Sequence, residues 1–80
     1  MEKRIGIVGI VVLDGAAVKE INSILSEFSQ CIRGRLGLPC LDENLNLISV
    51  IVEGTTDDIG ALTGKLGRLE GVKTKSLMMT

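Results

Sequence analysis

Two cysteines are the residues of this 80-residue chain that most readily suggest metal or redox chemistry. Cys31 and Cys40 lie nine positions apart, and an extended segment of that length separates its ends by about 30 Å, whereas a disulfide needs Cα atoms within about 7 Å. They form no C-x-x-C pair, and the chain has no histidine to complete a metal site with them. We therefore predict two reduced thiols that pack as small apolar side chains, with no metal and no cofactor.

A phosphate-binding loop is suggested by the dipeptide Gly64-Lys65. That motif also needs glycine at position 59 and Ser or Thr at position 66, where this chain has Ile59 and Leu66. The dipeptide also falls inside a predicted helix rather than before one. Because no arrangement in the sequence places a nucleophile beside a base, we predict that the chain is not an enzyme.

Arg33 and Arg35 are the first candidates for binding an anion. Alternate positions lie on one face of an extended strand, where two guanidinium groups can hold a carboxylate or a phosphate. The alternative is that these charges keep an edge strand soluble and prevent it from pairing with other chains.

The starts of two predicted helices are the second candidates. Unpaired backbone N–H groups at a helix start can receive a small anion or an amino acid. Ordinary capping by neighbouring side chains is the alternative. The residues concerned are Asp14, Gly15, Thr55 and Thr56.

Hydrophobic periodicity assigns these candidates to six elements. Apolar residues alternate along the strands and recur at helical spacing between them. Thr55 and Asp58 have the spacing of a capping box, and Pro39 with the polar residues 42–44 predicts a turn. The predicted elements are strand 3–13, helix 15–29, edge strand 30–38, strand 45–53, helix 55–69 and strand 72–78.

This element order, βαββαβ, predicts an α+β, ferredoxin-like fold. A faint repeat supports it, because residues 11–15 align with residues 50–54 and each segment leads from a strand into an acidic residue and a glycine. The fold has a four-stranded antiparallel sheet with two helices on one face, and its first and third strands are central. We predict a single domain over residues 1–80.

The aliphatic content of the chain predicts self-association. Apolar residues make up 45% of the sequence and the mean hydropathy is +0.39, yet a domain of this size buries only about 60% of the surface that its unfolded chain exposes. The two central strands are apolar on both faces, so we expect a second copy to cover the open face in a homodimer or tetramer. Val8, Ile10 and Val50 are assigned to this interface.

Three glycines also belong to the predicted interface. Gly60, Gly64 and Gly67 recur on one side of the second helix, where together they cost about 3 kcal/mol relative to alanine. Either this side of the helix packs closely against a partner chain or a ligand, or the fold tolerates a helix of low stability.

Net charge and aromatic content argue against nucleic-acid and membrane binding. The formal net charge is −1 and Phe28 is the only aromatic residue, so there is no overall basic charge and no set of stacking platforms for bases. The apolar run 5–13 is too short to cross a membrane, and its β-branched residues favour a strand over a signal peptide. We therefore expect a cytoplasmic protein.

Residues 34–39 (GRLGLP), 46–69 (NLISVIVEGTTDDIGALTGKLGRL) and 71–72 (GV) resemble the iron-only (FeFe) hydrogenase system regulators. These are small ACT-like domains, similar in fold to the C-terminal domain of the nickel-responsive regulator. The resemblance covers essentially the whole chain and is most specific over residues 55–69. It implies a self-associating, ferredoxin-like domain. The nickel sensor binds its metal with histidines and a cysteine, so nickel sensing is not implied for a chain without histidine.

The sequence and the resemblance together predict a regulatory domain. We expect a homo-oligomer that binds a small effector or a protein of the hydrogenase system at its subunit interface. We expect it to lack a DNA-binding segment of its own, so that any control of transcription requires a separate DNA-binding partner. The alternative is a structural assembly or scaffold module with no small-molecule ligand.

Overall fold

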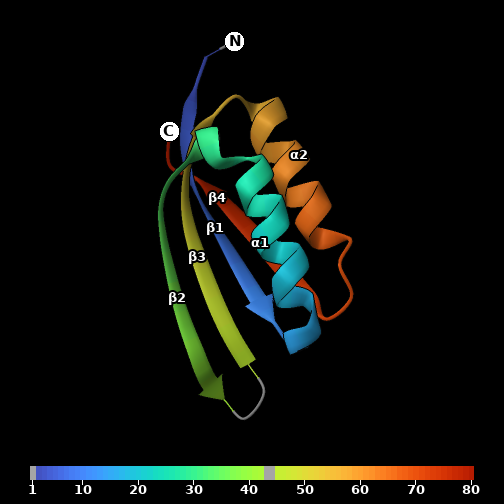
Figure 1. Ribbon diagram of the computed structural model, residues 1–80. Helices are drawn as coiled ribbons and strands as arrows, with labels where there is room; N and C mark the ends of the chain where they lie inside the picture. Colours follow the sequence, from blue (N-terminus) through green and yellow to red (C-terminus); the bar gives the residue numbers. More distant parts are fainter. Residues whose placement is uncertain (1, 43–44) are drawn as a thin grey trace.

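A four-stranded antiparallel sheet carries two helices on one of its faces (Figure 1). The computed structural model describes residues 2–42 and 45–80, and for residues 40–42 the backbone alone. The sheet order is β2-β3-β1-β4, so the first and third strands are central and the predicted ferredoxin-like fold is confirmed. The elements are β1 (Arg4–Val12), η1 (Gly15–Ala17), α1 (Val18–Glu27), η2 (Ser29–Cys31), β2 (Ile32–Asp42), β3 (Leu45–Gly54), α2 (Thr56–Gly67) and β4 (Val72–Met78).

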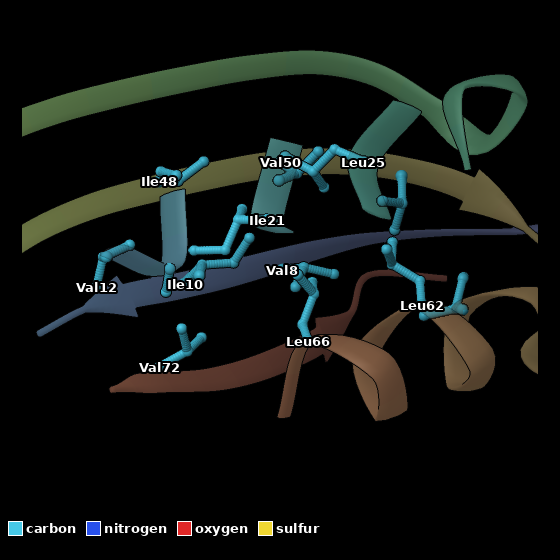
Figure 2. Close-up of a cluster of buried hydrophobic side chains, with 13 residues drawn as sticks. Val8, Ile10, Val12, Ile21, Leu25, Ile48, Val50, Leu62, Leu66 and Val72 are labelled. Carbon is cyan, nitrogen blue, oxygen red and sulfur yellow. The ribbon is translucent and has the colours of Figure 1, made fainter. Parts of the chain in front are cut away.

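The hydrophobic core lies between the sheet and the two helices (Figure 2). Alternate residues of the two central strands supply the sheet side, and the apolar stripes of α1 and α2 supply the other. Ile21 and Leu62, one from each helix, are fully buried against the strands. The buried residues are Val8, Ile10, Val12, Ala17, Ile21, Leu25, Ile48, Val50, Val52, Ile59, Leu62, Leu66 and Val72.

The assignment of Val8, Ile10 and Val50 to a subunit interface is wrong. Each of them is 0% exposed and belongs to the core beneath the helices. In the antiparallel register Val8 pairs with Val50, which places both side chains on the same, helix-covered face. The open face is formed instead by the intervening residues of each strand.

Two predicted boundaries also change. Helix α1 is shorter than the predicted 15–29, because 3₁₀ turns occupy both of its flanks. Strand β2 does not turn at Pro39 but continues to Asp42, and its register against β3 shifts between Leu38 and Asp42. An edge strand accepts proline because one of its sides needs no N–H donors. Residues 43–44 of the predicted turn lie outside the described residues.

Candidate functional site

The open face of the sheet is an apolar surface that neither helix covers (Figure 1). The cross-strand pairs show which residues form it. Ile7 of β1 pairs with Ile51 of β3 on one side and with Leu77 of β4 on the other, and Val11 pairs with Leu47. Leu36 and Leu38 of β2 pair with residues of the same set, Ser49 and Leu47. We call this surface the open face; its large apolar residues are Ile5, Ile7, Val11, Leu36, Leu38, Leu47, Ile51 and Leu77.

Several of these side chains are strongly exposed. Leu36 is 59% and Leu77 62% exposed, and Ile51, in the middle of the surface, is 39% exposed. Lys73 and Lys75 of β4 are also on this side of the sheet, opposite Val11 and Gly9. They border a hollow of about 220 Å³ that includes Gly9, Val11, Leu47 and Thr74. The open face thus combines a broad apolar surface with the cationic Lys73 and Lys75 of β4 and the Arg33–Glu53 ion pair between β2 and β3.

The two arginines do not form a pair. Ile32 pairs with Val52 and Gly34 pairs with Ile51, so β2 contains one extra residue at Arg33. Such a bulge reverses the alternation that follows it. The Arg33 Nε donates to Glu53 Oε1 at 2.9 Å, whereas Arg35 Nη2 donates to Asn22 Oδ1 of α1 at 2.6 Å. Of the two alternatives for these arginines, the one in which both clamp an anion from a single face is therefore wrong.

Arg35 lies beside two hollows on the helix side of β2. One, of about 240 Å³, includes Val18, Gly37 and Ile48; the other, of about 310 Å³, includes Leu25, Ser29 and Ile32. Arg35 lines both. A cation between two largely apolar recesses can bind an acid group while the recess accepts its carbon chain.

The predicted site at Asp14 and Gly15 is occupied by a cap. Asp14 Oδ1 accepts the Ala16 N–H at 3.0 Å, which satisfies one of the amides that an anion would need. A hollow of about 330 Å³ beside it is lined by the carboxylates of Asp14, Glu20 and Glu70, with Arg68 as the only cation. This geometry favours the capping explanation over anion binding.

At Thr55 and Thr56 the capping box forms as its spacing predicts. Thr55 Oγ1 accepts the Asp58 N–H at 3.1 Å, and Asp58 Oδ2 accepts the Thr55 N–H at 3.2 Å. Thr56 is exposed in the first turn of α2. The N–H groups of Thr55 and Asp58 are thus bonded within the chain.

The glycine stripe of α2 is exposed. A Cβ at Gly60 or Gly64 would meet nothing within 4 Å, and one at Gly67 would only touch the Thr74 Cγ2 at 3.6 Å. Close packing within the chain is therefore not the reason for these glycines. A role in a subunit interface stays a prediction.

Cys31 is a free, partly buried thiol, and the side chain of Cys40 lies outside the described residues. Within the described part of the chain, Cys, Asp and Glu side chains form no group of three that could hold a metal ion. No helix among the described residues is long and apolar enough to cross a membrane.

Sequence reasoning missed two residues that shape the surroundings of Arg35. Asn22 on α1 holds the guanidinium, and Gly37 opens the hollow beside it. A polar Asn on the exposed side of an amphipathic helix carries no distinctive signal. The sequence shows a glycine at position 37, but it does not show the bulge that places this glycine on the helix side of the sheet.

Comparison with protein families gives one match over most of the chain. The TM1266-like family, described as a proposed iron-only hydrogenase system regulator, matches residues 4–76. Among solved structures, the uncharacterized protein TM1266 from Thermotoga maritima is 39% identical, with a TM-score of 0.92 over 99% of this chain and 100% of that one. No curated protein sequence matches the chain.

Two more distant structures share the fold alone. The ACT domain from GTP pyrophosphokinase of Chlorobium tepidum is 21% identical, with a TM-score of 0.75 over 96% of this chain and 89% of that one. CPII, a nitrogen regulatory PII-like protein from Thiomonas intermedia K12 solved with ADP, AMP and bicarbonate, is 13% identical, with a TM-score of 0.54 over the whole of both chains.

Proposed function

The chain belongs to the TM1266-like family of iron-only hydrogenase system regulators, and from this membership we propose that it is a non-enzymatic regulatory domain that works as a homo-oligomer. Its partners are a second copy of itself and either a small effector or a protein of the hydrogenase system. The observation that carries the proposal is the apolar open face, where Leu36, Ile51 and Leu77 are exposed on a surface that they share with five other aliphatic residues. A water-soluble monomer rarely leaves so many large aliphatic side chains on one surface.

Charge on the open face supports a particular position for the second copy. Lys73 and Lys75 have no ion-pair partner among the described residues, and burying an unpaired ammonium group is costly. The second copy is therefore centred on β1, β3 and β2, and the two lysines stay at its wet rim.

The change Ile51→Asp tests this assembly. It places a carboxylate in the middle of the open face without touching the core, so we expect the dissociation constant of the oligomer to rise by at least about tenfold. Sedimentation velocity over a micromolar concentration series measures this. Ser23→Asp, on the exposed side of α1, is the matched control and should leave association unchanged. A wild-type protein that sediments only as the 8.5 kDa monomer would refute the proposal.

A structural assembly module without a ligand is the second candidate function. It is favoured by the capping bonds, because Asp14 and Thr55 are already engaged at the helix starts that an effector would use. Thermal-shift screening against amino acids, nucleotides and small acids separates the two functions. A ligand that binds only the folded state must raise its melting temperature, whereas an assembly module shows no response.

A further inference from the structure

Arg35 is the centre of a groove between α1 and the edge strand β2. Its side chain lines the hollow of about 240 Å³ on one side and the hollow of about 310 Å³ on the other. Figure 1 shows both helices on the same side of the sheet and β2 at its outer edge, away from α2. The groove therefore results from the fold, because two helices do not cover all four strands.

The charge of Arg35 is not neutralised by the described residues. Its Nη2 donates to the neutral Asn22 Oδ1 at 2.6 Å, and the ion pairs found in the described part of the chain are Arg33–Glu53 and Lys65–Glu27. A guanidinium has five N–H donors, so the bond to Asn22 fixes its position while most donors stay available. This combination is suited to a bidentate bond with an incoming carboxylate.

Gly37 provides the space for the rest of such a ligand. It pairs with Ile48, which is 7% exposed on the helix-covered face, so position 37 faces the same side of the sheet. A Cβ at Gly37 would meet nothing within 4 Å. Val18, Ile48 and Pro39 also line this hollow. Its 240 Å³ corresponds to roughly six to eight water-sized groups.

We propose that this groove binds a small aliphatic carboxylate, with the acid group on Arg35 and the carbon chain over Gly37. A single cation suits a monoanion, whereas a phosphate dianion usually needs several donors. The inference rests on the proposed regulatory function, because it names the chemical class of the effector. It places that effector on the helix side of the sheet, opposite the face proposed for self-association.

Binding of hexanoate, followed by ligand-observed NMR titration, tests the proposal. We expect the wild-type protein to bind hexanoate and not the neutral hexanamide. Arg35→Gln should weaken hexanoate binding by at least about tenfold, since charge-assisted hydrogen bonds are lost. Arg33→Gln is the matched control, because Arg33 lies on the other face and is paired with Glu53; it should bind as the wild type does.

Filling the hollow gives an independent test. Gly37→Leu should abolish hexanoate binding, and it should fold, because the position has space and its φ is not positive. Circular dichroism checks folding, and sedimentation of the same variants should show unchanged association.

Three results would each overturn the proposal: equal binding of hexanoate by Arg35→Gln and wild type, equal binding of hexanamide and hexanoate by the wild type, or no binding of hexanoate by the wild type at about 10 mM. If hexanoate fails while the chain still self-associates and another ligand raises its melting temperature, this inference falls and the regulatory function stands.

Discussion

Arg33 and Arg35 illustrate how one extra residue changes the chemistry of a strand. With regular alternation, positions 33 and 35 share a face. The bulge at Arg33 breaks that alternation, so Arg33 pairs with Glu53 on the open side and Arg35 reaches Asn22 on α1. The sequence left open a two-arginine clamp or a charged edge strand, and the structure has one neutralised arginine and one whose charge is available to a ligand. Because the two arginines lie on opposite faces, a substitution of Arg33 is a control for the same substitution of Arg35 in a binding measurement.

At the same scale, Gly64→Ala tests why α2 contains glycines. Because a Cβ at Gly64 meets nothing within 4 Å, we expect alanine to stabilise the fold by about 0.5–1 kcal/mol through its higher helix propensity. Urea unfolding at low protein concentration measures the change. A loss of stability would contradict it. If the variant also associates less well in sedimentation, the glycine stripe packs against a partner chain, as the sequence predicts.

The elements follow their local signals where capping and periodicity act alone. The capping box starts α2 at the predicted place, and the apolar stripe Ile59, Leu62 and Leu66 faces the core. Strand β2 departs from its local signals, because it continues past Pro39 to Asp42 in pairing with β3. The pairing is interrupted after Leu38 and resumes at Asp42, so Pro39 lies at an irregularity of an edge strand, where proline is tolerated.

The change Thr55→Ala tests the start of α2. It removes the oxygen that accepts the Asp58 N–H at 3.1 Å, so we expect a loss of about 1 kcal/mol in the free energy of unfolding. Chemical denaturation followed by circular dichroism gives the value. Thr56→Ala, one residue further along on the exposed surface of the helix, is the control and should change stability much less. Equal losses in both variants would contradict the capping role.

For the whole molecule, the division of the sheet into a helix-covered face and an open face decides what each apolar residue does. Val50 is 0% exposed and its neighbour Ile51 is 39% exposed. Both are aliphatic residues of the same central strand, yet one belongs to the core and the other to the proposed interface. The regulatory proposal depends on this division.

The pair Val50→Asp and Ile51→Asp tests the division directly. A carboxylate at position 50 enters the core without a partner, which costs several kcal/mol and should unfold the domain. The same change at position 51 should leave the fold intact and dissociate the oligomer. Circular dichroism and sedimentation of the two variants distinguish the outcomes. A folded Val50→Asp protein would show that the two faces are assigned the wrong way round.

Part of the face assignment could have been read from the sequence. On the third strand Ile48, Val50 and Val52 form an uninterrupted aliphatic set, whereas Ser49 interrupts the alternate set; on the first strand each set contains one glycine, Gly6 or Gly9. A set without small or polar residues is the better candidate for a fully buried core. The prediction chose the wrong set because both contain enough aliphatic residues to appear buried.

The sequence by itself determined the order and type of the elements, the central position of β1 and β3, the start of α2 and the family. The elements and the start of α2 depend on local spacing, on capping residues and on the alternation of apolar side chains, which are contiguous in the chain, whereas the family follows from the resemblance of residues 34–39, 46–69 and 71–72. Only the tertiary structure decided which face of the sheet is covered and that β2 has a bulge at Arg33. It also decided that Arg35, Asn22 and Gly37 lie at the same groove. These features depend on cross-strand register and on helix placement, which join residues distant in sequence. A shift of one residue in register moves every following side chain to the opposite face.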